Sequence, residues 1–194
     1  MGKFMNTPNK LTMLRILLIP VFVLFMLGGD FIPYNYVGAI VVFIAASLTD
    51  LFDGRIARKR DIVTNFGKFL DPLADKSLVI SAFICLQAFG LVNPVVVIIL
   101  VMREFLVTSL RLIAVGDGKV IAADIFGKVK TVIQMFSIIA LLLMLCLIQV
   151  MDMTFLASSL TTAASVLSWL CAAAAVVSGA NYLIKNRHCI DAKS

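Results

Sequence analysis

The sequence predicts an all-α integral membrane protein with six transmembrane helices, formed by a single membrane-embedded domain over residues 1–194. Hydrophobic residues make up 61% of the chain, against roughly 45–50% in an ordinary soluble domain. The mean hydropathy is +1.05, and a soluble domain of this size could not remove so much apolar surface from water. Several apolar segments also approach the roughly 20 residues needed to cross a bilayer. A soluble helical bundle is therefore disfavoured.

The apolar segments run roughly over residues 12–29, 36–57, 66–90, 93–115, 125–150 and 157–184. The first resembles a signal peptide, because Lys3, Lys10 and Arg15 precede its apolar run. The segment that follows, Gly28-Gly29-Asp30-Phe31, has no small-x-small cleavage site, so we expect this helix to be retained. The cysteines are spaced too widely for a zinc site or a disulfide framework, and we expect them to be buried apolar residues.

The connections between these segments alternate in charge, which predicts their orientation. The connections near residues 28–36, 90–94 and 151–154 contain at most one acid each and no Lys or Arg. The basic residues of the other connections and ends include Lys3, Lys10, Arg15, Arg55, Arg58, Lys59, Arg60, Lys68, Lys119, Lys128, Lys130, Lys185, Arg187 and Lys193. Cationic loops stay in the cytoplasm, so we expect both the N- and C-termini to be cytoplasmic. A net charge of +6 then suits an anionic lipid leaflet and requires no nucleic acid.

Aspartates recur at helical spacing in the second and third segments. At about 100° per residue, Asp50, Asp53, Gly54 and Ala57 fall within about one quarter of a helix circumference. Gly67, Asp71 and Asp75 repeat the pattern at i, i+4 and i+8. A short basic turn joins the two helices, so we expect antiparallel neighbours whose acidic faces meet near the cytoplasmic end.

These carboxylates predict a metal site. Placing one charged aspartate inside a membrane helix is unfavourable by roughly 2.5–3.5 kcal/mol. Four carboxylates that converge also repel one another unless cations lie between them. Hard divalent ions such as Mg²⁺ or Mn²⁺ prefer oxygen ligands. The alternative is a salt-bridge network with Arg55, Arg58, Lys68 and Lys76, in which the small residues serve close helix packing. The paired spacing on two faces favours the metal site.

The motif Asp50-x2-Asp53-Gly54-x2-Ala57-Arg58-x8-Gly67-x3-Asp71-x3-Asp75 matches in full the signature of the CDP-alcohol phosphotransferase family, which this chain therefore resembles. The resemblance implies a six-helix membrane enzyme that forms homodimers, transfers a substituted phosphate from a CDP-alcohol to a second alcohol and releases CMP. It also implies that Asp50, Asp53, Asp71 and Asp75 hold two divalent metal ions, Mg²⁺ or Mn²⁺, with Asp75 as the catalytic general base. The implied CDP-diacylglycerol-binding residues are Asn9, Thr12, Gly54, Arg58, Thr64 and Gly67.

The flanking segments resemble those family members that make phosphatidylglycerophosphate. The similar stretches are Asn6 to Arg15, Arg103 to Thr108, Leu110-Arg111, Gly127 to Thr131, and Gln134. This resemblance implies CDP-diacylglycerol and glycerol 3-phosphate as substrates. We expect a multi-pass protein of the cell membrane, the inner or plasma membrane of a bacterium, with its active site facing the cytoplasm. It covers most of the first 135 residues, whereas the last sixty are generic apolar helix that says little about substrate.

An acceptor that carries a phosphate requires cations, and four basic residues are candidates. Arg103 and Arg111 lie two turns apart on similar faces of the fourth segment, and Lys128 and Lys130 begin the fifth. Glu104 can neutralise one arginine but not both, and a free Arg suits bidentate phosphate binding. The alternative is that these side chains reach out to lipid headgroups. No Cys–His or Ser–His pair supplies a nucleophile, and His188 is expected to be solvated.

Other readings stay open from the sequence alone. The same chemistry could use serine, inositol phosphate or phosphatidylglycerol as acceptor, although the basic set disfavours serine. An intramembrane prenyltransferase also binds Mg²⁺-diphosphate through aspartates, but without the Gly54, Ala57-Arg58 and Gly67 spacing. A divalent cation transporter could use the four acids as a permeation site, but the acids occur only once, with no second copy in the other half.

Overall fold

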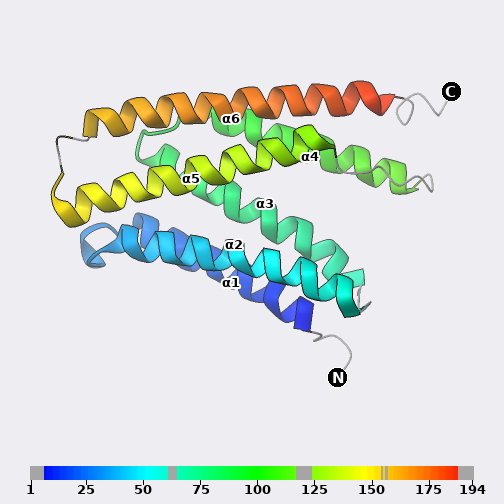
Figure 1. Cartoon of the computed structure of the whole chain (residues 1–194), viewed down its shortest axis with the longest axis horizontal. Helices are drawn as coiled ribbons and strands as arrows, with labels where there is room; N and C mark the ends of the chain where they lie inside the picture. Colours follow the sequence, from blue (N-terminus) through cyan, green and yellow to red (C-terminus); the bar gives the residue numbers. More distant parts are fainter. Residues whose placement is uncertain (1–6, 61–64, 117–123, 154, 156, 188–194) are drawn as a thin grey trace. The chain divides into compact units, whose positions relative to one another are not determined.

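The computed structural model describes residues 7–60, 65–116, 124–153, 155 and 157–187. For residues 7–11, 30, 50–60, 65–72, 75, 115 and 116 within these ranges, it describes the backbone and not the side chain. The described chain is helical throughout, which confirms the all-α prediction. Its elements are α1 (Thr7–Leu27), η1 (Gly29–Phe31), α2 (Asn35–Arg60), α3 (Asn65–Ala88), α4 (Pro94–Gly116), α5 (Ile125–Met151) and α6 (Ala157–Lys185) (Figure 1).

Each α-helix corresponds to one predicted apolar segment, and most ends agree within a few residues. The largest difference is at the start of α1, which begins at Thr7 rather than at residue 12. The hydrophobic pattern begins later than the helix does, because the first turn is polar. Pro8 is compatible with that turn, since a helix leaves its first N–H groups without intrahelical partners. Asn9, which precedes the predicted segment, therefore lies on the helix together with Thr12.

Local capping explains where two of the turns fall. Gly90 has φ +70° after the end of α3, and the Leu91 and Gly90 N–H groups donate to the carbonyls of Leu86 and Gln87 at 3.1 and 2.8 Å. This is a Schellman ending, which favours glycine at the left-handed position. The Asn93 side chain then accepts from the Val95 N–H at 2.9 Å and caps α4, which begins at Pro94.

The chain forms two compact units, described here separately. The first comprises residues 1–85 and 142–157. In it α1 and α2 pack antiparallel, since contacts of α1 residues later in the chain are with α2 residues earlier in the chain. The rings of Phe22 and Phe43 are 5.7 Å apart, and a Cβ at Gly38 would overlap the Phe25 ring. Gly38 thus allows Phe25 to lie directly against α2.

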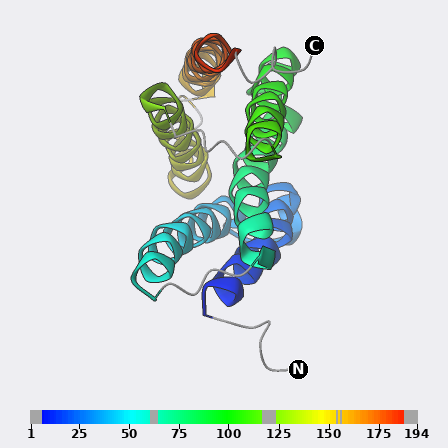
Figure 2. The same ribbon diagram turned by 90° about the vertical axis from the view of Figure 1, so that its right-hand side faces the viewer.

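The second unit comprises residues 86–141 and 158–194. Figure 2 shows α6 nearly end-on, with α5 beside it. The Cys171 thiol donates to Ser137 Oγ at 3.3 Å, which joins α6 to α5. Tyr182 of α6 packs in one buried cluster with Val107 and Leu110 of α4. These contacts join α6 to both α5 and α4, so α6 contributes to the core of this unit.

The helices carry the surface of a membrane protein. Among the described residues, α5 and α6 are long and apolar enough to cross a bilayer, and shorter apolar helices span Thr12–Leu27, Asn35–Thr49 and Lys76–Ala88. Large apolar side chains are also exposed on several helices, including Leu17, Phe105, Phe136, Val166 and Trp169. Soluble monomers rarely expose such continuous apolar surface, because its contact with water is unfavourable.

Candidate active site

The four aspartates lie on the helical backbone of the first unit. Asp50 and Asp53 are in the last part of α2, and Asp71 and Asp75 are in the first half of α3. Spacings of three and four residues place the members of each pair one turn apart on one helix face. The helical assignment on which the predicted pattern depends is therefore correct. The side chains of all four lie outside those that the structure describes.

The remaining signature residues have the same status. The backbones of Gly54 and Arg58 lie in α2, and that of Gly67 lies in the first turn of α3. Thr64 falls outside the described residues, and the Asn9 side chain does too. Among the side chains that are described, no group of three or more His, Cys, Asp and Glu residues is placed to hold a metal ion. The metal site thus stays a prediction for the aspartates.

A buried arginine of α1 lies beside the acidic part of α2. Arg15 is only 1% exposed, and its Nε donates to the carbonyl of Ala46 at 3.3 Å and to Thr49 Oγ1 at 3.4 Å. Thr49 directly precedes Asp50 in the chain. Thr12, one turn before Arg15, is equally buried, at 1%. The side chains of Arg15 and Thr12 therefore lie on the buried side of α1, and Arg15 contacts α2 directly before Asp50.

A cluster of charged side chains forms inside the second unit, and we call it the Arg103 cluster. Arg103 lies near the middle of α4, where its Nη1 donates to Glu104 Oε1 at 3.0 Å. Lys130 of α5 also donates to Glu104 Oε1, and the Lys130 side chain is 6% exposed. Arg103 Nη2 donates to Ser178 Oγ of α6 at 2.6 Å. The Glu104 carboxylate thus contacts two cations, Arg103 of its own helix and Lys130 of α5.

Among the described residues, the Nε atom of Arg103 is buried and has no hydrogen-bond partner. A buried N–H without an acceptor is unfavourable by roughly 1–3 kcal/mol. Two cations and one carboxylate also leave the described part of this cluster positively charged. An anion with several acceptor oxygens would relieve both conditions, and phosphate is such an anion.

The structure divides the four basic residues predicted for the acceptor phosphate. Arg103 and Lys130 lie in the Arg103 cluster, whereas the side chains of Arg111 and Lys128 are exposed. Arg103 and Arg111 are eight residues apart, which at about 100° per residue offsets them by about 80° around the helix. That offset places one arginine toward α6 and leaves the other at the surface.

A family model for CDP-alcohol phosphatidyltransferases matches residues 5–178, which include every position of the aspartate signature. The chain belongs to the CDP-alcohol phosphatidyltransferase family.

Among its relatives is the CDP-diacylglycerol–glycerol-3-phosphate 3-phosphatidyltransferase of Bacillus subtilis (strain 168), 43% identical over 93% of this chain and 95% of the relative. A Rickettsia felis protein of the same name is 40% identical over 71% of this chain and 75% of its own length. A Mycobacterium tuberculosis protein named probable phosphatidylglycerophosphate synthase is 41% identical over 71% of this chain and 66% of its own. The similarity to the Bacillus protein extends beyond the first 135 residues, to which the sequence resemblance was limited.

The polar residues of α6 in this CDP-alcohol phosphatidyltransferase were missed by the sequence reasoning. Ser178 contacts Arg103, and Asn181 Nδ2 donates to Asp124 Oδ2 at the start of α5. Lys185 Nζ lies 3.9 Å from Asp124 Oδ1. The signal was present: Ser178, Gly179 and Asn181 follow directly after the apolar run of residues 169–177. Polar side chains within a membrane helix are unfavourable unless they find partners, and so indicate an interior face.

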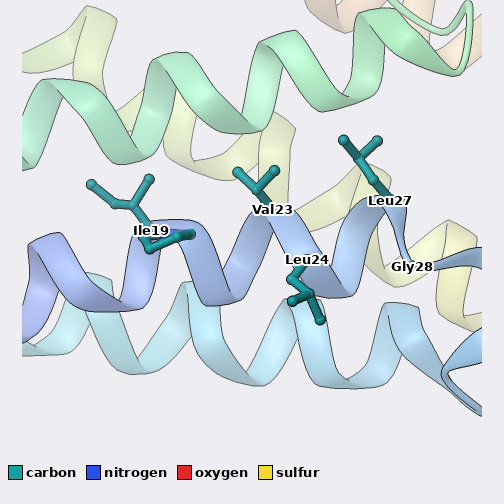
Figure 3. Close-up of a pocket in the computed structure, with 6 residues that line it drawn as sticks. Ile19, Val23, Leu24, Leu27 and Gly28 are labelled. Carbon is teal, nitrogen blue, oxygen red and sulfur yellow. The ribbon is translucent and has the colours of Figure 1, made fainter.

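An open apolar depression also lies on α1, with a volume of about 580 Å³, lined by Ile19, Pro20, Val23, Leu24, Leu27 and Gly28. Figure 3 shows Ile19, Val23 and Leu27 directed to one side of the helix and Leu24 to the other. No side chain of this lining carries a polar group. The depression therefore has no means of binding the nucleotide or phosphate substrates that this family uses, and it suits contact with lipid.

Proposed function

We propose that this chain transfers the phosphatidyl group of CDP-diacylglycerol to sn-glycerol 3-phosphate, and releases phosphatidylglycerophosphate and CMP in phospholipid biosynthesis. The observation that carries the proposal is the complete aspartate signature on α2 and α3 of a chain 43% identical to the Bacillus enzyme of that name. The identity extends over 93% of the chain, so it includes the helices that bear the acceptor candidates as well as those that bear the signature.

Asp50, Asp53, Asp71 and Asp75 would hold two divalent metal ions, Mg²⁺ or Mn²⁺. Their carboxylates are the oxygen ligands that these hard cations prefer, and helical spacing brings each pair to one face. When bound, such ions neutralise the charge that builds on the leaving CMP and orient the pyrophosphate. The ions also compensate the carboxylates, which otherwise repel one another inside the membrane.

The CDP part of the donor would contact Gly54, Arg58, Thr64 and Gly67, with Asn9 and Thr12 closing over it. Glycines allow a ligand to approach the helix backbone closely, and an arginine supplies charge for a phosphate. Thr12 lies one turn before Arg15 on the face of α1 that contacts α2, so this part of α1 is held against the signature helix. The acyl chains can remain in the bilayer, and the nucleotide needs no enclosed apolar pocket.

The transfer is a direct displacement. The C1 hydroxyl oxygen of glycerol 3-phosphate forms a bond to the phosphorus that carries diacylglycerol, and the bond from that phosphorus to the CMP oxygen breaks. Asp75 would accept the hydroxyl proton as a general base. An aspartate is a weak base at neutral pH, so positioning of the hydroxyl must provide much of the rate.

The acceptor phosphate would bind at the Arg103 cluster. Lys130 is buried there and Arg103 is partly buried, and the buried Arg103 Nε lacks a hydrogen-bond partner among the described residues. We assign a different role to Arg111 of α4 and Lys128 of α5. Their side chains are exposed, and their positive charge would attract anionic substrates toward the site. The cations also explain why an acceptor without phosphate, such as serine, is disfavoured.

In the membrane we propose six spans, a homodimer, cytoplasmic N- and C-termini and a site facing the cytoplasm. In addition to the two long apolar helices, three shorter ones fit this arrangement. Helix α4 carries three charged residues, Arg103, Glu104 and Arg111, which are expected of a helix that lines a polar site. A bacterial inner or plasma membrane suits the organisms of the relatives.

Purified protein tests this function directly. CDP-diacylglycerol is supplied with Mg²⁺ or Mn²⁺, and CMP release is compared across glycerol 3-phosphate, serine, inositol phosphate and phosphatidylglycerol. We expect release with glycerol 3-phosphate and none after chelation of the metal by EDTA. Release with a different acceptor would overturn the acceptor assignment and keep the reaction class. No release with any acceptor, together with Mg²⁺ flux in liposomes, would point to the transporter.

The same assay tests the aspartates. We expect Asp71→Asn and Asp75→Asn each to lower turnover by at least about a hundredfold, because they remove a metal ligand or the general base. The matched control is Asp152→Asn, the same exchange at an exposed turn position with φ +50°, which asparagine tolerates. Near-normal turnover by either signature variant would contradict the mechanism.

A further inference from the structure

We propose that Ser178 of α6 is a positioning residue that holds the Arg103 guanidinium in place for the acceptor phosphate, and so determines affinity for glycerol 3-phosphate. The inference rests on the proposed function. It assigns to the last helix a part in acceptor recognition, although the sequence pattern of that helix indicates only an apolar span.

The contacts of Arg103 hold both ends of its guanidinium group. Nη1 donates to Glu104 Oε1 at 3.0 Å on its own helix, and Nη2 donates to Ser178 Oγ at 2.6 Å on α6. Because the group is planar, two contacts through different nitrogens define both its position and the direction of its plane. The Nε–H is left without a partner among the described residues. A guanidinium has five N–H donors, so others remain for a ligand.

Small residues of two helices surround this group. A Cβ added at Gly179 would lie 3.3 Å from Arg103 Cγ, which is tighter than ordinary contact. A Cβ at Gly127 of α5 would lie 3.5 Å from Nη2 and 4.0 Å from Ser178 Oγ. The stem and the head of Arg103 therefore fit against glycines, and only the Ser178 hydroxyl projects from α6 as a polar contact to it.

These contacts argue against the alternative position for an arginine in a membrane helix, which is at the lipid headgroups. A long cationic side chain can extend to the lipid headgroups, and it does so when nothing holds it inside. Arg103 is instead 12% exposed. Glu104 alone would anchor one nitrogen and leave the plane free to turn. The second hydrogen bond, from Nη2 to Ser178 Oγ, fixes the orientation of the guanidinium plane.

The first test is Ser178→Ala. Loss of one hydrogen bond to a charged group corresponds to about a tenfold change in affinity. We expect KM for glycerol 3-phosphate to rise about tenfold, with kcat and KM for CDP-diacylglycerol unchanged. Ser178→Thr keeps the hydroxyl and should recover most of the affinity. The control is Ser168→Ala in the same helix, because Ser168 is equally buried and bonds its own helix at the Ser165 carbonyl.

Arg103→Ala separates this inference from the function on which it rests. In that background Ser178→Ala should change KM no further, because the hydrogen bond no longer exists. Gly179→Ala should raise KM for glycerol 3-phosphate more than Gly127→Ala, because its Cβ is the closer one. Thermal unfolding of each variant identifies loss of fold, which would lower the apparent kcat and would not raise KM for one substrate alone.

Two results would overturn the positioning role of Ser178 alone: an Arg103→Ala effect on acceptor KM without a Ser178→Ala effect, or equal effects of Ser178→Ala on both substrates. If Arg103→Ala itself leaves acceptor KM unchanged, the acceptor site is elsewhere and the proposed role of the Arg103 cluster fails. A tenfold, acceptor-specific rise that disappears in the double variant would establish Ser178 as a positioning residue.

Discussion

At the scale of single residues, the structure distinguishes basic side chains that the sequence presents alike. Lys130 is buried and Arg103 is partly buried against Glu104, whereas Arg111 and Lys128 are exposed. Arg15 is also buried, at 1% exposed, although its position in the sequence placed it among the basic residues of the connections and ends. A buried cation needs acceptors, and those acceptors come from other helices. Residue type and spacing therefore identified the candidates, and tertiary contacts decided which of them are interior.

Arg15 provides a prediction at this scale. Arg15→Met should lower the free energy of unfolding by about 1–3 kcal/mol, because the Ala46 carbonyl and the Thr49 hydroxyl lose a buried charged donor. Turnover should fall as well, since Asp50 directly follows Thr49. Denaturation in detergent and the CMP-release assay measure the two effects. Arg187→Met, at an exposed position after α6, is the control. Equal effects of the two variants would mean that only net charge matters.

At the scale of helices, hydrophobic runs located each of the six α-helices, and polar side chains contribute to how the helices join. The first apolar pattern began too late because the polar first turn of α1 has no hydrophobic signal. The start of α2 also depends on polar contacts that the hydrophobic pattern does not indicate. Gln149, near the end of α5, accepts from the Tyr36 N–H at 3.3 Å and donates to Asn35 Oδ1 at 2.5 Å. One amide thus serves an N–H of the first turn of α2, which has no partner within the helix.

We expect Gln149→Leu to lower stability by about 1–2 kcal/mol, because Asn35 is 1% exposed and would lose a buried partner. Gln149→Glu keeps an acceptor for the Tyr36 N–H and should have a smaller effect. Thermal unfolding with CMP release measured in parallel is the test, and KM for both substrates should stay unchanged. Gln87→Leu at a partly exposed position of α3 is the matched control. A loss no larger than that of the control would assign these contacts no role in stability.

At the scale of the whole molecule, composition and charge alternation predict topology. The six-span arrangement with cytoplasmic ends stays a prediction, as do the metal ions and the homodimer. Sandwich fusions of a reporter active only outside the cytoplasm test it. Insertions near residues 28–34 and 89–93 should be active, and insertions near 61–64 and 117–123 should not. Activity on the basic side would reverse the orientation, and with it the cytoplasmic placement of the site.

The sequence by itself determined the family, the aspartate signature and the helices that carry it, because each depends on residue type and local spacing. The family assignment is confirmed by a match over residues 5–178. Only the tertiary structure decided that Ser178 contacts Arg103, that Lys130 shares Glu104 with Arg103, and that Arg15 is interior. The physical reason is distance along the chain. Arg103 and Ser178 are 75 residues apart, and no periodicity reports which faces of two apolar helices will meet.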